Sequence, residues 1–440
     1  MATDGEEQSR IQPMVTNRRK SQGRATRTAL LYILPAAIIM LVLTVWPLIY
    51  QFWLSFTNYT NINLRTDNLF LQIFGSFSPT ITGYNSPEFI GLQNYLSIIG
   101  GGLASVLSGF DFWRILLFNV IWTAVNLVFH VSIGVAIAVL LNQKGFRFKR
   151  FYRALYIIPW AMPGLVTAMI WNNMFDQQNG AVNQILKFLG FKGDLSWWVQ
   201  VEPPFSLIPP YVQIPSWANP YLMLLILIVL IIVPFFSKWV RSHWAKFIVP
   251  WVLGLELFFI FGLPPLLNSL GGSTAAESTT QFVGLGQVLP LSFYAALITN
   301  VWLGWPFMMV VASGALQSIP TDLYEAADVD GASRWQSFWN ITVPMLRPAM
   351  IPAIILGMTM TFNQFNVLFF TTGGGPLHQT EILVTEAYRL VNQTNIFVQG
   401  VGSARPYGVA AAFAFIVFAV LGVITIITNR ITRATASYNE

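Results

Sequence analysis

Long apolar runs, separated by short polar stretches, dominate the pattern of residues along this chain. A helix needs about 20 mostly apolar residues to cross the roughly 30 Å hydrocarbon core of a bilayer. The pattern predicts eight such helices, at Ala29–Trp53, Phe112–Leu141, Phe151–Phe175, Pro220–Phe236, Phe247–Leu267, Leu289–Leu316, Ala349–Thr371 and Gly408–Thr428.

The composition agrees with this pattern. Hydrophobic residues make up 55% of the 440 residues and charged residues 10%, and the mean hydropathy is +0.58. A soluble domain of this size could not cover so much apolar surface with so few charges. The chain has no cysteine, which excludes disulfides, thiolate metal sites and cysteine nucleophiles. We therefore expect an all-α polytopic membrane protein.

The distribution of Lys and Arg orients the predicted spans. The net charge is +6, but the basic residues cluster on alternate loops, which indicates membrane topology rather than binding to nucleic acid. With the N-terminus in the cytoplasm, six of the 24 Lys and Arg residues lie outside, namely Arg65, Arg114, Lys187, Lys192, Arg389 and Arg405. This bias predicts an even number of spans and cytoplasmic N- and C-termini.

Between these spans the chain divides into recognisable segments. Residues 1–28 form a basic cytoplasmic tail that we expect to be disordered, and residues 29–111 hold the first span and an external loop. The core covers residues 112–430, with an inserted external segment and helical hairpin at 199–286 and a cytoplasmic loop at 319–348; residues 431–440 form a cytoplasmic tail. The first span exceeds the apolar length of a signal peptide, so we interpret it as a retained helix.

The third predicted span contains two prolines. Pro159 and Pro163 lie near its start, in the stretch from Ile157 to Pro163. Proline removes a backbone donor and clashes with the preceding turn of a helix. We expect the span to be kinked or unwound there.

The polar stretch from Thr321 to Pro348 lies between two apolar runs, so it must emerge from the bilayer. Thr321 is a candidate N-cap, and Asp322 and Glu325 then fall in the first turn, where acidic side chains suit the helix dipole. Gly331 offers the left-handed conformation that ends a helix. Ser333 and Gln336 form a capping-box pattern for a second short helix, which we expect Pro344 and Pro348 to close. The product is a helix-turn-helix knob; a merely structural cytosolic loop is the alternative.

The order of residues in this knob resembles the EAA loop of ABC-importer permeases, which docks onto a separate ATPase. The residues that carry the resemblance are Glu325, Ala326, Ala327, Asp330, Gly331 and Pro344. The resemblance implies that they couple the chain to that ATPase. No G-x-x-x-x-G-K-[ST] motif occurs in the chain, so nucleotide would bind to the partner and not here.

Other stretches extend the resemblance to the carbohydrate importer permeases of the MalF type. They are the segments from Phe89 to Tyr95, from Asn300 to Met309 and from Tyr407 to Ala412, and the Phe362-Asn363 and Gly374-Gly375-Pro376 elements. The resemblance implies a MetI-like ABC type I importer permease core over 112–430, with the inserted hairpin. It also implies a multi-pass protein of the prokaryotic cell (inner) membrane.

Residues of the family's sugar pocket carry over to positions of this chain. They are Trp160, Asn300, Leu303, Gly304, Phe307, Gly357, Thr361 and Asn363. Trp160 and Phe307 stand where the maltose pattern has tyrosine, and Thr361 stands where it has asparagine. The resemblance implies a sugar, such as maltose/maltodextrin, trehalose or a related glucoside, without fixing which one.

The chemistry of the sixth and seventh spans agrees with a neutral polyhydroxyl ligand. Such a ligand needs aromatic faces for its C–H groups and amides or hydroxyls for its O–H groups. The candidates are Trp302, Trp305, Phe307, Asn300, Asn363, Gln364 and Asn366. The alternative is that the amides join helices to one another and the aromatic rings only pack.

Two ionisable residues, His130 and Glu256, lie far from the ends of the predicted spans. A buried acid is costly, so Glu256 must face a partner, water or a subunit interface. A proton relay is one interpretation. A protonated, hydrogen-bonded structural group is favoured, because no series of acids accompanies it.

The importer hypothesis implies a set of partners. They are a second permease subunit that completes a heterodimer, an ATP-binding cassette ATPase dimer that holds Mg-ATP, an extracellular or periplasmic sugar-binding protein, and the lipid bilayer. No cofactor is expected on this chain itself. An ion-coupled secondary transporter of a small polar solute is the alternative, although inverted repeats and intramembrane acids are scarce. An intramembrane enzyme lacks support, because no HExxH or GxSxG motif occurs.

Overall fold

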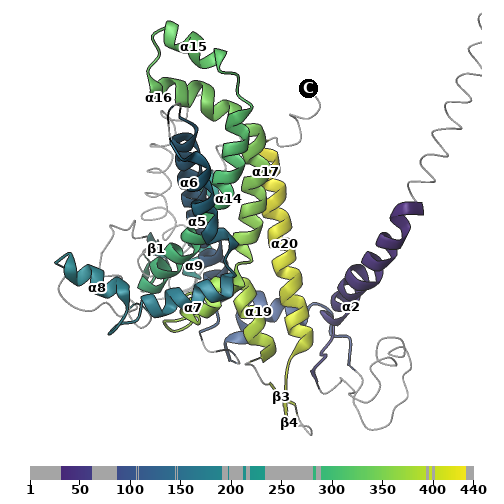
Figure 1. Ribbon diagram of the computed structural model, residues 1–440. Coiled ribbons are helices and arrows are strands. Elements are labelled where there is room, and N and C mark those ends of the chain that lie inside the picture. Colours follow the sequence, from purple (N-terminus) through teal and green to yellow (C-terminus); the bar gives the residue numbers. More distant parts are fainter. Residues whose placement is uncertain are drawn as a thin grey trace, which may run out of the picture. The chain divides into compact units, whose positions relative to one another are not determined.

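The computed structural model describes residues 31–61, 87–190, 197, 212–214, 219–232, 281–283, 289–392, 396–398 and 402–432, except 106, 108, 144 and 146. Its helices and strands are drawn in Figure 1. The contacts divide the chain into two units. The first comprises Met1–Asn94 with Tyr407–Ala412, and the second comprises Tyr95–Pro406 with Phe413–Glu440.

The first unit is built on an apolar helix, Leu31–Leu54, which contains the π-turn η1 (Leu41–Val45) and α2 (Trp46–Leu54). Directly after it, Thr57 pairs with Phe89 in an isolated antiparallel bridge. The amide of Asn94 donates to the backbone oxygens of Ser55 and Thr57, at 2.9 Å each. These contacts give the stretch from Phe89 to Tyr95 a structural role, because Asn94 supplies hydrogen-bond donors for backbone oxygens that follow the first helix.

The core of the second unit is formed by α5 (Phe112–Asn142) and α14 (Leu291–Gln317), which pack along each other. At Gly134 the two helices meet so closely that a Cβ atom would lie 2.6 Å from Met308 Cβ and 2.9 Å from the Trp305 oxygen. Small residues allow this approach between membrane helices. The apolar core beside it consists of Ala138, Leu141, Met308, Met309, Ala312, Leu316, Ile319, Leu346, Met350 and Ala353.

The third predicted span is broken, as the two prolines indicated. It consists of α6 (Lys149–Ala161) and α7 (Gly164–Met174), whose axes are bent by 89°. Pro159 stays inside α6, and the break lies at Met162 and Pro163. The second proline therefore supplies the break, because Met162 before it takes the extended conformation that a residue preceding proline prefers.

The seventh predicted span differs from the sequence prediction at both ends. After α16 (Arg334–Ser337) the π-turn η6 (Phe338–Thr342) runs directly into α17 (Val343–Phe362), and α18 (Phe365–Thr372) follows a short break. The prediction that Pro344 and Pro348 close the second short helix of the loop is therefore wrong. Pro344 is the second residue of α17, directly after the π-turn, and Pro348 lies inside the helix.

The remaining described elements are shorter, apart from the last helix. They are α4 (Gln93–Ile99), η3 (Gly102–Ser105), α8 (Ala181–Phe188), β1 (Val212–Ile214), α9 (Pro220–Ile232), β2 (Gln281–Val283), α15 (Asp322–Val329), α19 (Leu383–Asn392), β3 (Ile396–Val398), β4 (Gly402–Ala404) and α20 (Tyr407–Thr432). Two antiparallel pairs, β1 with β2 and β3 with β4, are the strands of the described part. The described residues are thus mainly helical, with two short strand pairs.

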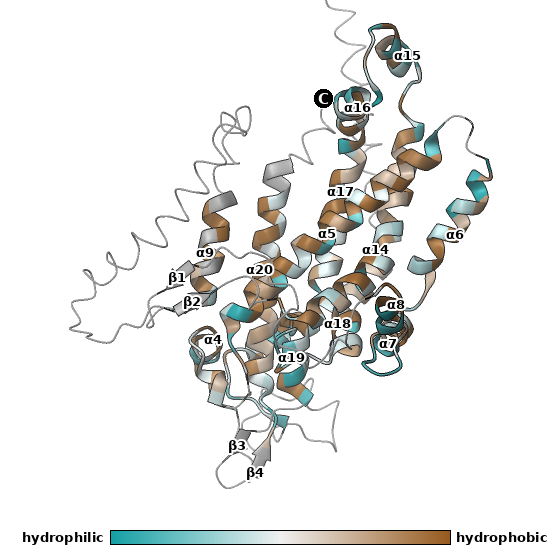
Figure 2. Ribbon diagram, turned by 90° about the vertical axis from the view of Figure 1, so that its left-hand side faces the viewer, coloured by the Kyte–Doolittle hydropathy of each residue, from teal (hydrophilic) through white to brown (hydrophobic). Residues whose placement is uncertain are grey.

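Five helices in the described residues are long and apolar enough to cross a membrane, or up to six if the bent α6–α7 pair counts as one span. Figure 2 shows apolar residues along α5, α14 and α17, and hydrophilic residues gathered at their ends. Of the predicted fourth span, α9 covers Pro220–Ile232. The fifth span, Glu256, the region around Lys238–Lys246 and the tails at 1–28 and 433–440 lie outside the described residues.

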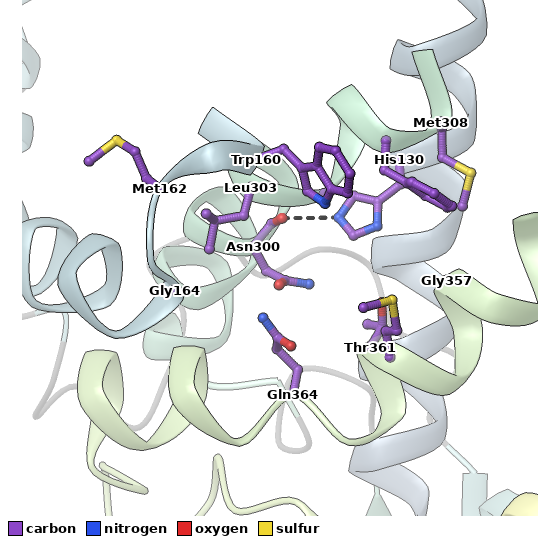
Figure 3. Close-up of a pocket in the computed structure, with 13 residues that line it drawn as sticks. His130, Trp160, Met162, Gly164, Asn300, Leu303, Met308, Gly357, Thr361 and Gln364 are labelled. Atoms are coloured by element: carbon purple, nitrogen blue, oxygen red, sulfur yellow. Dashed lines mark hydrogen bonds between the residues drawn. The ribbon is translucent and has the colours of Figure 1, made fainter. Parts of the chain in front are cut away.

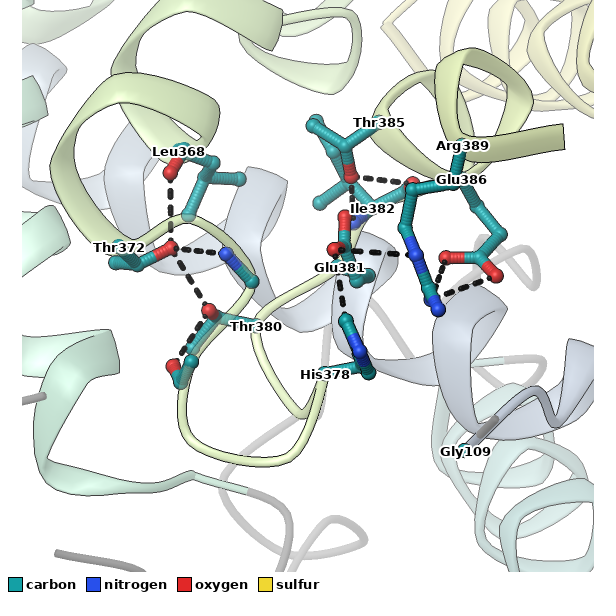
Figure 4. Close-up of polar contacts among 12 residues, drawn as sticks. Gly109, Leu368, Thr372, His378, Thr380, Glu381, Ile382, Thr385, Glu386 and Arg389 are labelled. Carbon is teal, nitrogen blue, oxygen red and sulfur yellow. Dashed lines mark hydrogen bonds and ion pairs between the residues drawn. The ribbon is translucent and has the colours of Figure 1, made fainter. Parts of the chain in front are cut away.

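At the end of the second unit opposite α15 and α16, a buried cluster of charged side chains holds the loop between α18 and α19 (Figure 4). Arg389 donates to both carboxylate oxygens of Glu386, at 3.0 and 2.9 Å, and lies 4.0 Å from Glu381. Glu381 in turn lies 3.4 Å from His378. Because these charges pair with one another, the loop can be buried against α5.

Two polar residues of α5, Arg114 and Asn119, also form hydrogen bonds with the backbone at this end of the second unit. Arg114 donates to the backbone oxygens of Gly109 and His378, at 3.0 and 2.9 Å. The amide of Asn119 donates to the Phe362 oxygen at 3.1 Å and accepts from the Leu383 N–H at 3.0 Å. The Asn119 side chain therefore supplies hydrogen-bond partners for a backbone oxygen at the end of α17 and a backbone N–H at the start of α19.

The contact at Gly134 predicts the effect of one added methyl group. Gly134→Ala places a Cβ against backbone and Cβ atoms that cannot move separately from their helix, so we expect it to destabilise the fold by about 1–3 kcal/mol. Gly314→Ala is the matched control, because the same change on α14 meets open space and removes the helix penalty of glycine. Thermal unfolding in detergent measures both; equal melting temperatures would contradict the close contact.

The buried Glu386 predicts a pH dependence of stability. Burial raises the pKa of Glu386 from its ordinary value of 4.5 to about 7, although Arg389 opposes the shift. An acid whose pKa rises on folding favours the folded state while it is protonated. Stability should therefore fall as the pH rises from about 4.5 to 7 and level off above that.

The test is the thermal unfolding of the wild type, Glu386→Gln and the exposed control Glu88→Gln across that pH range. The stability of Glu386→Gln should no longer fall as the pH rises, whereas the stability of Glu88→Gln should fall as in the wild type. The same slope in Glu386→Gln and the wild type would show that another group titrates.

Candidate functional site

A cavity of about 190 Å³ lies in the second unit, between α5, α6, α14 and α17. Ligand pockets usually measure about 300–1,000 Å³, so this cavity on its own would hold part of an oligosaccharide. Its lining residues are His130, Trp160, Met162, Gly164, Asn300, Leu303, Gly304, Phe307, Met308, Gly357, Met360, Thr361 and Gln364. Seven of the eight residues predicted for a sugar pocket thus line one cavity.

The eighth, Asn363, does not line the cavity. It ends α17, and its amide donates to the Thr359 oxygen of the preceding turn at 3.1 Å. Its neighbour Gln364, in the break before α18, lines the cavity instead. The sequence offered both residues as candidates, and the break in the backbone decides that Gln364 faces the cavity.

An aromatic pair forms one wall of the cavity. The rings of Trp160, at the end of α6, and Phe307, on α14, lie 5.9 Å apart at an angle of 37°. Trp160 is 51% exposed although it is apolar, so one face of its ring is open. Open aromatic faces of this kind suit the C–H surface of a sugar ring. Trp302 and Trp305 do not line the cavity; their rings pack on Trp171 and Tyr156.

Polar groups face the same space from α5, α14, α17 and the break before α18. Figure 3 shows the carboxamides of Asn300 and Gln364 pointing toward each other across the cavity, with Thr361 beside them. His130 lies beside Asn300, and its Nε2 is 3.0 Å from the Asn300 backbone oxygen. Apart from His130, none of the lining residues is titratable, so the cavity suits a ligand without formal charge.

Two glycines make room for the cavity wall. A Cβ at Gly304 would collide with the imidazole of His130, and a Cβ at Gly357 would lie 2.6 Å from the methyl group of Met308. The sequence motif contained both glycines, but it gave no sign of the histidine. Met162, Met308 and Met360 were also missed, because methionine in an apolar run is normally packing.

The predicted coupling knob has the local structure that its sequence indicated. Asp322 and Glu325 lie in the first turn of α15, which ends at Val329. Gly331 follows in the left-handed region with φ +75°, and Ser333 and Gln336 form the capping box of α16. Thr321 differs: it occupies the N-cap position with helical backbone angles and no side-chain cap.

Most of the knob is accessible. Glu325, Ala326, Asp330 and Gly331 are exposed, as is Pro344, and Ala327 is half-buried. Tyr324 links α15 to η6, because its hydroxyl lies within hydrogen-bond distance, 2.9 Å, of the Thr342 hydroxyl. An exposed helix with almost no side chain at Ala326 leaves its backbone open to close approach by another molecule.

Comparisons with known proteins point to one family. Residues 205–436, more than half of the chain, match the sequence profile of the binding-protein-dependent transport system inner membrane component. The galactooligosaccharides transport system permease protein GanP of Bacillus subtilis is 27% identical over 82% of this chain and 62% of its own length. The maltodextrin transport system permease protein MalC of Streptococcus pneumoniae is 25% identical over 88% of this chain and 65% of its own. This chain therefore spans less than two thirds of these two relatives.

A relative closer in length is the trehalose/maltose transport system permease protein MalF of Thermococcus litoralis, 26% identical over 88% of this chain and 89% of its own. The fold matches a chain in the crystal structure of a bacterial ABC transporter involved in the import of the acidic polysaccharide alginate. That match has a TM-score of 0.55 and 16% identity, and covers 95% of this chain and 99% of the other. The resemblance to MalF-type permeases and the all-helical importer fold are thus confirmed. The protein belongs to the family of binding-protein-dependent transport system inner membrane components.

Proposed function

We propose that this chain is a membrane-spanning permease subunit of an ATP-driven importer of a neutral oligosaccharide. The observation that supports this most directly is that seven residues, taken from separate motifs, line one cavity with an aromatic wall and uncharged amides. The named substrates of the relatives, galactooligosaccharides, maltodextrin and trehalose/maltose, are oligosaccharides of this kind. Maltose/maltodextrin, trehalose or a related glucoside is our choice among them.

The energy for import would come from a separate ATPase dimer. The chain lacks a phosphate-binding loop, so Mg-ATP would be held by that partner and this chain would carry no ATPase site. The exposed α15, with Glu325 and Ala326 on its surface, supplies a surface for docking. Movement of the docked knob would be transmitted through η6, which joins α16 to α17 without a loop.

Two further partners complete the proposal. Because the cavity is too small for a whole oligosaccharide, it suits a heterodimer in which a second permease subunit supplies further wall. An extracellular or periplasmic sugar-binding protein would deliver the ligand; the related alginate transporter has been crystallised in complex with an alginate pentasaccharide-bound periplasmic protein. The distribution of Lys and Arg supports cytoplasmic termini and a knob on the ATP side of the cell membrane.

The side of the membrane on which the knob lies can be measured directly, because the chain contains no cysteine. Val329→Cys puts the chain's single thiol on the knob, at a position that is 88% exposed. In right-side-out vesicles we expect it to escape a membrane-impermeant maleimide until the vesicles are opened. Leu377→Cys, 76% exposed in the loop after α18, is the control and should react at once. Immediate reaction of Val329→Cys would place the knob on the wrong side for an ATPase.

The coupling role of the knob is tested by Gly331→Val in the complex reconstituted into proteoliposomes. Valine is strained in the left-handed conformation by about 1–2 kcal/mol, so the turn between α15 and α16 should be displaced. We expect ATP-driven sugar uptake to fall roughly tenfold or more, in line with a loss of at least 1.4 kcal/mol.

Gly145→Val is the matched control, since Gly145 also has a positive φ and open space around it but lies between α5 and α6. It should keep most of the uptake. Equal loss in both variants would mean that strain alone is responsible. Uptake by this chain without the ATPase, driven by an ion gradient, would reject the importer and favour a secondary transporter.

A further inference from the structure

Two residues of α5, Asn126 and His130, contact α14 from one side and have no role in the mechanism described above. They lie four residues apart, on the same face of the helix, and both are buried. Asn126 binds the side chain of Asn300, and His130 binds its backbone oxygen. Asn300 is therefore held at two points by the neighbouring helix.

The first of these bonds fixes which way the Asn300 carboxamide points. The Trp122 backbone oxygen can only accept, so the Asn126 amide nitrogen must donate to it, at 2.8 Å. The Asn126 oxygen is then the acceptor that faces Asn300, and it accepts from the Asn300 amide nitrogen at 2.8 Å. The amide nitrogen of Asn300 is thus occupied on the α5 side, and its carboxamide oxygen is left toward the cavity.

The second bond fixes the backbone at the same residue. The Asn300 oxygen is a carbonyl and can only accept, so the His130 Nε2 carries a hydrogen and donates to it at 3.0 Å. The ring fills the space beside Gly304 that any Cβ would need. A residue larger than glycine at 304 would displace the histidine, and with it the backbone anchor.

Gln364, on the opposite side of the cavity, is held differently. Among the described residues, none forms a hydrogen bond with its carboxamide, which Figure 3 shows pointing at Asn300. Gln364 can therefore turn to donate or accept according to the ligand. Asn300 cannot turn, because a reversed carboxamide would bring its oxygen against the oxygen of Asn126.

We propose that Asn126 and His130 are positioning residues that fix Asn300 as a hydrogen-bond acceptor, so that the cavity takes a sugar hydroxyl at this point and rejects a carboxylate. A hydroxyl can donate to the Asn300 oxygen, whereas a carboxylate would bring two acceptors together. Sites built to bind a hydroxyl discriminate strongly against groups that cannot make that bond. The inference rests on the proposed function, since it specifies which sugars the same cavity transports.

The test uses the complete transporter in proteoliposomes, with ATP and saturating binding protein. The neutral probes are maltotriose, trehalose and galactotriose. For each probe that is taken up, we measure the maximal rate for a derivative with one CH₂OH oxidised to a carboxylate and for monodeoxy and monofluoro derivatives. At saturation the rates report the permease rather than the binding protein.

The wild type should transport the neutral sugar at least tenfold faster than the carboxylate. Asn126→Leu removes the acceptor that fixes Asn300, so we expect this ratio to fall to about threefold or less while the complex still assembles. Asn126→Asp is the matched control, measured at a pH at which the buried carboxyl is protonated: its O–H replaces the amide donor to the Trp122 oxygen and its carbonyl oxygen accepts from Asn300, so it should retain the wild-type ratio. A role in packing alone would lower the amount of assembled complex and leave the ratio unchanged.

The wild type alone gives a second measurement if Asn126→Leu fails to assemble. Fluorine can accept a hydrogen bond but cannot donate one. At the hydroxyl that contacts Asn300, the fluoro and deoxy derivatives should therefore be impaired equally, by about tenfold. The position is identified as the one whose deoxy derivative is no longer impaired relative to the parent sugar in Asn300→Ala.

The outcomes separate the two proposals. If no neutral probe is taken up with ATP, the proposed function is wrong. If a probe is taken up but Asn126→Leu keeps the wild-type ratio, or the fluoro derivative restores uptake at the Asn300 position, the function stands and the fixed-acceptor inference is overturned.

Discussion

The close approach of α5 and α14 is the constraint on which the rest of the second unit depends. Two glycines on opposite helices allow it: Gly134 admits the backbone of α14, and Gly304 admits the imidazole of His130. In a bilayer no hydrophobic effect drives helices together, so close packing and interhelical hydrogen bonds must do so. The same contact carries the bonds from Asn126 and His130 to Asn300. The contact that packs α5 against α14 is therefore also the contact that positions Asn300.

Two breaks in helices then define the cavity. One separates α6 from α7 and the other separates α17 from α18, and each leaves a lining residue at its edge, Trp160 and Gln364 respectively. The two outer segments, α7 and α18, pack against each other. Irregular backbone at membrane depth is tolerated where it lines a cavity or is buried in protein. The two breaks thus place residues at the cavity, and the packing of α7 against α18 stabilises the broken helices.

Local signals in the sequence were enough for the knob, whereas seven residues of the cavity followed from the resemblance to a known family. Gly331 and the Ser333–Gln336 pair act within one turn of chain, so their roles follow from the residues alone. Pro344 misled because the π-turn directly before it, through which the helix continues, could not be foreseen from the sequence. His130 could not be connected to Gly304, because the two lie 174 residues apart and meet only through the packing of α5 and α14. Asn363 and Gln364 were both candidates, and only the break between α17 and α18 decides that Gln364 faces the cavity.

The pairing of β1 with β2 has a consequence for how this chain tolerates change. Val212 lies opposite Val283, so the chain leaves and returns at neighbouring points although some 70 residues separate them. A segment whose two ends are joined in this way adds little to the entropy cost of closing the loop when it lengthens. A change in the length of the chain between the strands would therefore cost little in loop closure, except at α9 (Pro220–Ile232), which packs on α5.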